Sequence, residues 1–190
     1  MQEVVKQLPP HYYRCILADP PWSFKTYAPD GGNRSARKHY NTMSLGQLAD
    51  LKVRAIADLS CWMFLWAVTP MLPAALSLMT SWGFDYSGTA FVWAKTTRTG
   101  SRWHIGLGYT TRKNVELCLL GKCGSPSVNS HSVRELMIAP IREHSRKPDE
   151  QYERIERFCD GPRIELFSRS VRPRWDAWGD QVEKFREVVK

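Results

Sequence analysis

Runs of apolar residues about as long as a β-strand recur along the chain, and polar segments rich in Gly, Pro or Ser separate them. The clearest run covers residues 61–68 and contains no polar side chain. Uninterrupted runs of this length are typical of strands that are buried on both faces of a sheet. The pattern predicts strands over residues 14–18, 61–68, 86–94, 114–120 and 164–167.

Signals for the start and end of helices lie between these runs. Ser44, with Gln47 three residues later, forms a candidate capping box and predicts a short helix. Thr69 followed by Pro70 predicts the start of a second helix, which runs to about residue 82 and stops at Gly83. Further helices are predicted over 148–159, with Tyr152, Ile155 and Phe158 on one face, and over 181–189, whereas 128–146 has no clear pattern.

Strands that alternate with helices indicate an α/β protein with a parallel-type sheet covered on both faces. The sequence shows no internal repeat and no linker, so we expect a single domain over residues 1–190. Two long polar segments, 23–41 and 95–111, are predicted to be mobile loops. The Gly-x-Gly-x-x-Gly phosphate-binding pattern is missing from the sequence, which argues against an ordinary dinucleotide-dependent dehydrogenase.

Composition and charge narrow the class of protein. Hydrophobic residues make up 43% of the 190 residues, as in a globular protein, and no apolar stretch reaches the length of a membrane span. Met1-Gln2-Glu3 does not begin a signal peptide, so we expect a cytoplasmic protein with no membrane partner. The net charge of +8 and the pI near 9.4 favour a polyanionic partner.

Cysteine and histidine usage argues against disulfides and a structural metal. The five cysteines form no Cys-x-x-Cys pair, and three lie in apolar runs, as expected for reduced thiols in a core. The five histidines are scattered without metal-ligand spacing, so we expect no metal site.

The most informative motif, Asp19-Pro20-Pro21-Trp22, follows the first predicted strand. The exocyclic amine of a nucleobase is a poor nucleophile because its lone pair is delocalised into the ring. A carboxylate and a backbone carbonyl that each accept one N–H would hold this lone pair toward an incoming methyl group, and prolines fix the turn that presents the carbonyl. The adjacent tryptophan offers a base a face to stack on. The alternative is a Pro-rich turn that closes a buried strand with a capping Asp.

A second group of charged and aromatic residues lies near the C-terminus. Residues 144–148 precede a predicted helix, residues 163–169 form a predicted strand and its exit, and Asp180 and Gln181 follow two tryptophans. Open α/β sheets bind ligands at the carboxyl ends of their strands, so this group could line a ligand site. An acid or amide there can accept hydrogen bonds from a ribose, and a lysine can pair with a carboxylate. The alternative is a set of surface salt bridges beside a Trp-rich core.

Together these motifs resemble the family of the catalytic subunit of the eukaryotic messenger-RNA adenine methyltransferase, with its small bacterial and phage relatives. The resemblance covers roughly residues 14–181, and Asp19-Pro20-Pro21-Trp22 matches the family's catalytic motif without change. It implies a Rossmann-like S-adenosylmethionine-dependent methyltransferase fold in permuted order, with the catalytic motif ahead of the cofactor segment. The other matching motifs, in family order, are Tyr40-Asn41-Thr42-Met43, Phe64-Leu65-Trp66, Val92-Trp93-Ala94-Lys95, Cys118-Leu119-Leu120-Gly121, residues 144–150 and Ile164-Glu165-Leu166-Phe167.

The resemblance also implies roles for single residues. Asp19 is expected to hydrogen-bond the target amine or the methionine amino group, while Pro20 and Pro21 shape the carbonyl that faces the amine. Trp22 is expected to pack beside the base, and Lys147 to face the methionine end of the cofactor or the substrate. The implied cofactor-binding residues are Asp19, Lys147, Glu165, Phe167, Arg169, Asp180 and Gln181, the last pair near the ribose, and the implied substrate-side residues are Tyr40, Lys95 and Glu116.

The chain departs from the family pattern at two places. Asp180 replaces an Asn of the eukaryotic enzymes, a change that keeps an acceptor for a ribose hydroxyl. Val171-Arg172 stands where those enzymes have His-Asn, so no cofactor contact is assigned there.

The two long polar segments supply a candidate surface for nucleic acid. Basic groups could bind phosphates and aromatic rings could stack a displaced base, which must be flipped out of a duplex to reach the site. The alternative is that both loops are solvated and disordered until a ligand binds. The residues are Lys25, Arg34, Arg37 and Lys38 around the first segment, Lys95, Arg98, Arg102, Arg112 and Lys113 around the second, and Tyr27, Tyr40, Trp103 and Tyr109 among them.

The predicted function is methylation of the adenine 6-amino group in nucleic acid by S-adenosylmethionine. The small size and the bacterial or phage style of the chain favour DNA over RNA. One alternative is an inactive family member that serves as a nucleic-acid-binding scaffold for an active subunit, and another is a methyltransferase for a protein or small-molecule amine. The sequence leaves open a homodimer or a partner subunit.

Overall fold

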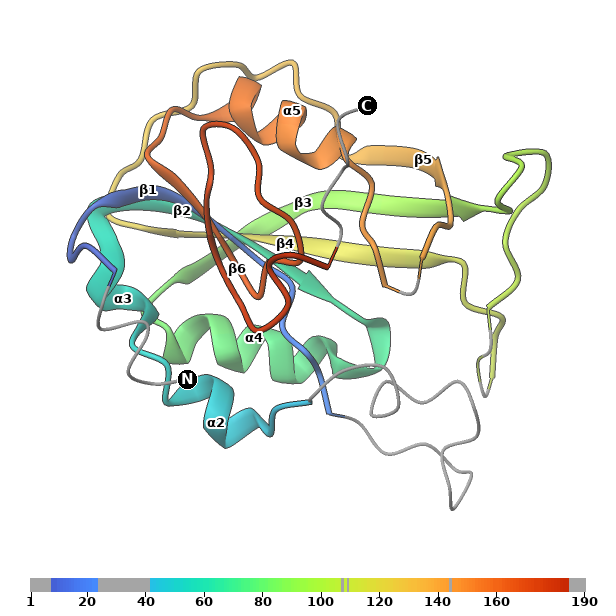
Figure 1. The fold of residues 1–190 in the computed structure, drawn as a ribbon, viewed down its shortest axis with the longest axis horizontal. Helices are drawn as coiled ribbons and strands as arrows, with labels where there is room; N and C mark the ends of the chain where they lie inside the picture. The colour runs from blue at the N-terminus through green and yellow to red at the C-terminus, as the bar shows by residue number, and fades with distance from the viewer. Residues whose placement is uncertain (1–7, 24–41, 107, 109, 144, 185–190) are drawn as a thin grey trace.

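The described strands form one sheet of seven strands. The computed structural model describes residues 8–23, 42–106, 108, 110–143 and 145–184. The strand order is β5-β3-β4-β2-β1-β6-β7 (Figure 1). The strands are β1 (Tyr13–Ala18), β2 (Ala57–Ala67), β3 (Asp85–Thr96), β4 (Val115–Cys123), β5 (Leu136–Pro140), β6 (Arg163–Leu166) and β7 (Asp176–Trp178).

Among these strands, β4 alone runs against its neighbours, β2 and β3. The pairs β1–β2, β1–β6, β3–β5 and β6–β7 are parallel. The prediction of an α/β protein is confirmed, but the prediction of a parallel-type sheet is wrong at β4. The reason is local, because β3 and β4 are consecutive strands of a hairpin and a hairpin reverses the chain.

The segment between β3 and β4 continues this hairpin beyond the sheet. Lys95 and Thr96, expected in a loop, belong to β3. The His104 N–H donates to the Lys95 carbonyl at 2.9 Å, and the Thr97 N–H donates to the Arg102 carbonyl at 2.8 Å. Figure 1 shows the resulting arm, in green and yellow, extending from the end of the sheet. We call residues 97–113 the basic arm, since Arg98, Arg102, Arg112 and Lys113 lie on it.

Within the described residues, three of the four predicted helices form, and two of these begin later than predicted. Ser44 caps α2 (Leu45–Ala49) by the expected capping box, because its Oγ accepts from the Gln47 N–H at 3.3 Å and its N–H donates to Gln47 Oε1 at 2.9 Å. The helix expected from Thr69 begins as a 3-10 turn, Thr69–Met71, before α4 (Leu72–Ser81). Pro70 and Pro73 fit such a start, since proline has no N–H to contribute. α5 (Glu150–Phe158) lies within the predicted range.

Some elements lie where the apolar pattern predicted none. They are α3 (Val53–Ile56), β5 in the unassigned 128–146 stretch, and β7. Each is short and buries only a few side chains, so it offers little periodicity to recognise. Of the helix expected over 181–189, residues 181–184 form turns and the rest lies outside the described residues.

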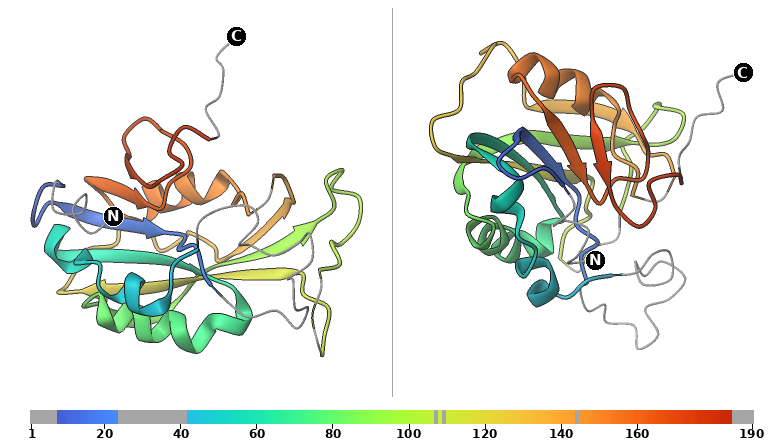
Figure 2. Two further views of the ribbon diagram at one scale, coloured as in Figure 1. Left: turned by 60° about the horizontal axis from the view of Figure 1, so that its bottom comes forward. Right: turned by 60° about the vertical axis from the view of Figure 1, so that its left-hand side comes forward.

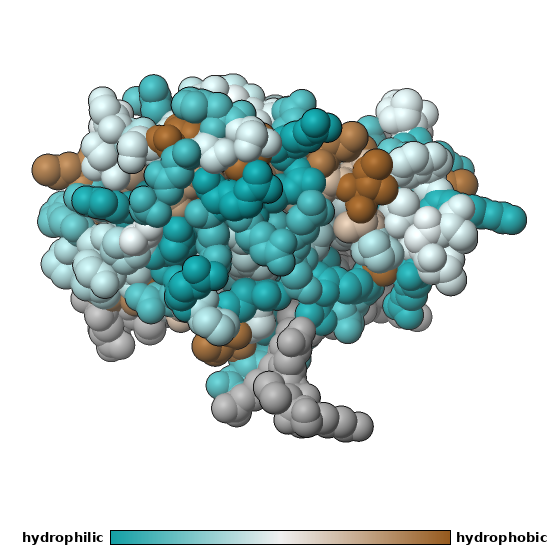
Figure 3. All heavy atoms as spheres, turned by 90° about the horizontal axis from the view of Figure 1, so that it is seen from above, coloured by the Kyte–Doolittle hydropathy of each residue, from teal (hydrophilic) through white to brown (hydrophobic). Residues whose placement is uncertain are grey.

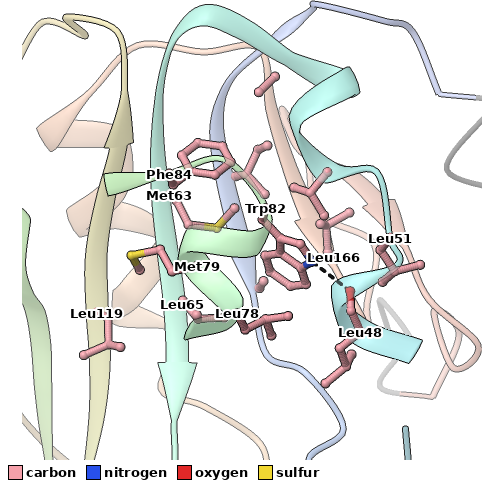
Figure 4. Close-up of a cluster of buried hydrophobic side chains, with 14 of the residues drawn as sticks. Leu48, Leu51, Met63, Leu65, Leu78, Met79, Trp82, Phe84, Leu119 and Leu166 are labelled. Carbon is pink, nitrogen blue, oxygen red and sulfur yellow. Dashed lines mark hydrogen bonds between the residues drawn. The ribbon is translucent and has the colours of Figure 1, made fainter. Parts of the chain in front are cut away.

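Helices cover the two faces of the sheet. α2 and α4 lie on one face and α5 on the other (Figures 1 and 2). On the α4 side of the sheet, Trp82, the C-cap residue of α4, packs with Met63 and Leu65 of β2, and its Nε1 donates to the Leu48 carbonyl at 2.8 Å (Figure 4). This bond ties α4 to α2. The opposite cluster, under α5, contains Phe64, Trp66, Phe91, Trp93 and Ile155.

One face of the surface is mostly hydrophilic, and the cysteines lie in the interior. Figure 3, which looks onto the α5 side, shows a mostly hydrophilic face. Each of the five cysteines is a free, buried thiol, as the sequence predicted. Within the described ranges, no helix has both the length and the apolar character needed to cross a membrane.

Strand direction determines which residues meet at the ligand-binding edge of the sheet. β1, β2, β3 and β6 share one direction, so their carboxyl ends lie along one edge. Antiparallel β4 begins at this edge, which brings Glu116, its second residue, to the ends of the other strands. An acid at the start of one strand can therefore lie beside an acid at the end of another.

Candidate active site

Asp19, the first residue after β1, lies at the centre of the site. Its Oδ2 accepts a hydrogen bond from Lys147 Nζ at 2.7 Å and lies 3.5 Å from an Arg169 nitrogen. Lys147 precedes α5, and Arg169 follows β6. Three predicted site residues therefore meet at the carboxyl edge of the sheet, where two cations hold the Asp19 carboxylate.

The two prolines form a turn at this point. The Trp22 N–H donates to the Pro20 carbonyl at 2.8 Å, and the Met43 N–H donates to the Pro21 carbonyl at 3.0 Å. A carbonyl oxygen has two lone pairs, so the Pro20 carbonyl and the Pro21 carbonyl can each accept a hydrogen bond from a further N–H. The role of one of them in facing a target amine stays a prediction.

Trp22 is buried, whereas a ring that stacks on a base needs an exposed face. The residue is 4% exposed, and its Nε1 donates to the Trp66 carbonyl at 3.2 Å. Its ring belongs to the hydrophobic cluster on the α4 side of the sheet. The predicted contact with a base stays a prediction, and it requires more of the ring than this conformation exposes.

Lys147 also begins a line of alternating charges. Its Nζ lies 3.3 Å from Glu116 Oε2, while Glu116 Oε1 accepts from Lys95 Nζ at 2.5 Å. The two ammonium groups lie over aromatic rings, Lys147 at 5.5 Å from the Trp66 centroid and Lys95 at 4.8 Å from the Trp93 centroid, within the range of cation–π contacts. Glu116 and Lys95, predicted on the substrate side, are thus joined through Lys147 to Asp19.

These contacts determine the charge of the residues involved. Burial alone would lower the pKa of Lys147, but attraction to Asp19 and Glu116 outweighs it and raises this pKa to about 12. Burial alone would raise the pKa of Glu116, but Lys147 and Lys95 hold it below its usual value. Both groups are therefore charged at neutral pH.

A pocket opens beside Asp19 and receives side chains from α5, β6 and the segments next to them. It contains five of the predicted cofactor-binding residues, Asp19, Lys147, Glu165, Phe167 and Arg169. Its other lining residues are Ser145, Arg146, Asp149, Gln151, Tyr152 and Ser170.

Among the described residues, Glu165 is one of three carboxylate residues that line the pocket, with Asp19 and Asp149. Its oxygens accept hydrogen bonds from the Tyr152 hydroxyl at 3.1 Å and from the Ser168 hydroxyl at 2.8 Å. Burial raises the pKa of Glu165 to about 7, although both hydrogen bonds oppose this effect, and the nearby Asp19 carboxylate raises it further. Glu165 therefore changes charge near neutral pH.

The turn after β6 has an unusual backbone conformation and is tightly packed. Phe167 has a φ of 62°, in the left-handed region that a phenylalanine rarely adopts. Its ring packs against Trp82 and Trp178, and the Ser168 N–H donates to the Trp178 carbonyl at 3.0 Å. A Cβ on Gly179 would lie 2.7 Å from the Ser168 carbonyl oxygen, so the close approach of β6 and β7 requires glycine here.

The remaining predicted residues lie apart from the pocket or outside the described ranges. Asp180 is exposed and Gln181 half-buried in the turn after β7, and neither is among the described residues that line the pocket. Tyr40 lies outside the described residues, as do Lys25, Arg34, Arg37, Lys38, Tyr27 and Tyr109. Their roles stay predictions.

Sequence reasoning missed Tyr152 and Ser168 as site residues. The apolar periodicity of α5 predicted Tyr152 only as a core side chain. Its hydroxyl was the available signal, since a buried tyrosine usually has a hydrogen-bond partner for that group. Among the described residues there is no cluster of three or more His, Cys, Asp or Glu side chains suited to a metal ion.

The pocket's donor set fits S-adenosylmethionine, which carries an ammonium group, a carboxylate and two ribose hydroxyls. Asp19 and Glu165 can accept from the ammonium group or the ribose, while Lys147 and Arg169 can pair with the carboxylate. Phe167 offers an apolar wall between these groups.

The fold is that of the α/β methyltransferase class. A family model described as MT-A70 matches residues 13–181, and the chain belongs to the MT-A70 family. Methyltransferases of this family depend on S-adenosylmethionine. The resemblance found in the sequence, and the methyltransferase class that it implied, are therefore confirmed.

Relatives of the chain include enzymes from bacteria and animals. The Type II methyltransferase M.MunI of a Mycoplasma species is 30% identical, over 96% of this chain and 83% of its own length. The human N(6)-adenosine-methyltransferase catalytic subunit METTL3 is 28% identical over 90% of this chain, and a Drosophila melanogaster N(6)-adenosine-methyltransferase MT-A70-like protein is 30% identical over 93%. The chain spans 28% of the length of each of these last two relatives.

Proposed function

We propose that the chain methylates the 6-amino group of adenine in nucleic acid, with S-adenosylmethionine as the methyl donor. The observation that carries this proposal is the Asp19 carboxylate, held 2.7 Å from Lys147 directly before two prolines and beside a pocket with a fitting donor set. The names of METTL3 and of the Drosophila relative support the choice of adenine.

The chain's own residues have two tasks in this reaction. Asp19 and a proline carbonyl accept the two N–H groups of the amine, which turns its lone pair toward the methyl group that the bound cofactor supplies. Asp19, Lys147, Glu165, Phe167 and Arg169 hold the cofactor, with Asp180 and Gln181 near its ribose. Holding two reactants in near-attack geometry can contribute about 7–11 kcal/mol to lowering a barrier.

The basic arm and the line of charges are the proposed nucleic-acid side of the site. Lys95 and Glu116 link the base of the arm to Lys147 and Asp19. Tyr40 is proposed as a further substrate-side residue. Trp103 on the arm is 57% exposed, so its ring is free to stack on a base. The arm's arginines would neutralise phosphates, and a base in a duplex would be flipped toward Asp19.

We further propose DNA rather than RNA as the polymer, in the cytoplasm of a bacterium or of a phage-infected cell. The match to M.MunI, a Mycoplasma protein that the chain covers over most of its length, supports this origin. The word "subunit" in the name of METTL3 supports a partner chain as the alternative to a homodimer.

The test is transfer of a labelled methyl group from S-adenosylmethionine to matched DNA and RNA oligonucleotides, single- and double-stranded, with and without adenine. Nucleoside mass analysis should find N6-methyladenine only in adenine-containing pools, and the productive pool identifies the polymer. Cofactor binding without product in any pool would instead favour the scaffold subunit or a protein or small-molecule amine as acceptor.

A further inference from the structure

Tyr152 contacts the pocket carboxylate from the first turn of α5. The residue is 7% exposed, and its hydroxyl lies 3.1 Å from each oxygen of Glu165. The Ser168 hydroxyl, in the turn after β6, donates to the same carboxylate at 2.8 Å. Glu165 therefore has two protein donors, which fix its direction before any ligand arrives.

Two side chains pack against the ring of Tyr152, Arg172 on its face and Trp175 in an edge-to-face contact. The Arg172 guanidinium lies 4.0 Å from the ring centroid, and Trp175 meets the ring edge-to-face at 5.4 Å. Arg172 is anchored by an ion pair with Asp149, the residue that precedes α5. Val171-Arg172 is one of the two places where the chain departs from the family pattern. The contacts of Arg172 with Tyr152 and Asp149 give it a structural role that needs no ligand.

We propose that Tyr152, braced by Arg172, is a positioning residue that keeps the Glu165 carboxylate ionised and aimed into the pocket, so that cofactor binding weakens when Glu165 takes up a proton. The inference rests on the proposed cofactor site and adds a pH-dependent element to it.

Electrostatics supports this role. The groups that act on Glu165 are Tyr152 from α5, Ser168 and Arg172 from the segment after β6, and Asp19 from the end of β1. Burial raises the pKa of Glu165 to about 7 and Asp19 acts in the same direction, while Ser168, Tyr152 and Arg172 oppose them. Removing Tyr152 or Arg172 thus raises this pKa further, and more of the protein carries a neutral Glu165 at pH 7.

A neutral Glu165 is the wrong partner for the cofactor. A neutral carboxyl group no longer attracts the cofactor's ammonium group by charge. Its proton also occupies an oxygen that could otherwise accept a hydrogen bond from a ribose hydroxyl. Affinity should therefore fall as the pH drops below about 7, by up to about tenfold for each pH unit.

The experiment is calorimetric titration of S-adenosylhomocysteine into the wild-type chain and the Tyr152→Phe variant between about pH 6 and about pH 9. Tyr152→Phe keeps the ring under Arg172 and removes only the hydroxyl. We expect its affinity to be about three- to fivefold lower at pH 7 and to approach the wild-type value at pH 9, which corresponds to an upward shift of the midpoint by up to about one pH unit. The matched control is Tyr86→Phe, whose hydroxyl belongs to a 53% exposed residue on β3.

Other outcomes separate this inference from the proposed function. Equal affinity of Tyr152→Phe and wild type at all pH values overturns the inference, as does a loss that does not vary with pH, since that is the result of altered packing. Arg172→Gln provides a second variant with an intact tyrosine, and it should shift the midpoint in the same direction. Failure of the wild-type chain to bind S-adenosylhomocysteine at any pH overturns the proposed function itself.

Discussion

The Lys147 ammonium group lies 2.7 Å from the Asp19 carboxylate, although 128 positions separate the two residues. The same ammonium group lies 3.3 Å from Glu116 at the start of β4. One cation, whose side chain is 7% exposed, therefore serves two carboxylates from strands that run in opposite directions. Asp19, the proposed catalytic residue, and Glu116, on the proposed substrate side, are both held by this one charge.

Replacing Lys147 by methionine should destabilise the fold, because the substitution leaves two largely buried carboxylates without their common partner. Breaking a buried ion pair from one side typically costs about 3–5 kcal/mol, and we expect a loss in this range. Denaturant unfolding at neutral pH measures it. Lys122→Met, at an exposed position of the same strand as Glu116, is the control and should change little. Equal losses for both variants would contradict the shared-charge account.

Asp19→Asn should abolish methyl transfer while the fold persists. The amide oxygen can still accept from Lys147, so the local structure is kept, but the negative charge that the amine N–H groups require is lost. We expect a decrease of at least about 100-fold in the transfer rate at saturating cofactor and nucleic acid. Asp58→Asn, at the opposite end of the sheet in an exposed pair with Arg14, serves as the control. Full activity of a folded Asp19→Asn protein would refute the assignment.

The stability of the chain should depend on the charge of Glu165. Burial raises the pKa of this group from its ordinary 4.5 to about 7, so the folded state holds the proton more tightly than the unfolded state. Stability therefore falls as the pH rises from about 4.5 to about 7 and stays reduced above that range. Glu165→Gln removes the charge, and we expect this variant to gain stability over wild type at pH 8 but not at pH 4.5.

Denaturant unfolding at both pH values checks this expectation. The control is Glu135→Gln, an exposed glutamate just before β5, which should show no such difference. If the advantage of Glu165→Gln were the same at both pH values, it would not come from ionisation of the group.

Gly179→Ala should disturb the turn after β6. The added Cβ would lie 2.7 Å from the Ser168 carbonyl oxygen and 2.9 Å from the Phe167 carbonyl carbon, and backbone cannot move aside as a flexible side chain can. We expect a stability loss of about 1–3 kcal/mol, typical of overpacking, together with weaker cofactor binding. In Gly46→Ala, the control within α2, no atom lies within 4 Å of the new Cβ, so stability should rise by up to about 1 kcal/mol. A Gly179→Ala variant as stable as wild type would contradict the crowding argument.

Local signals in the sequence identified much of the fold and the centre of the site. The apolar run of residues 61–68 lies within β2, and the Ser44 capping box begins α2 where the sequence predicted it. The place of Asp19 at the end of β1 was also readable, because an apolar run that stops at two prolines cannot continue as a central strand. Each of these features depends on the local chain, so neighbouring residues suffice to predict it.

Family motifs extended this reading to residues far from Asp19. Lys147, Glu165, Phe167 and Arg169 line the predicted pocket. Asp180 and Gln181 were predicted in the same way, but the described pocket does not include them. A motif identifies which residues belong together, whereas the positions of their side chains depend on turns whose geometry the motif does not specify.

The sequence by itself therefore determined the class of the protein, most of its strands and the position of Asp19 directly after the first of them, because periodicity, turn chemistry and family motifs are properties of short segments. Only the tertiary structure decided that β4 runs antiparallel, which brings Glu116 to Lys147, that Trp22 is buried in the core, and that Tyr152 donates its hydroxyl to Glu165. Strand direction, burial and long-range hydrogen bonds arise when the whole chain packs around one sheet, and no short segment contains that information.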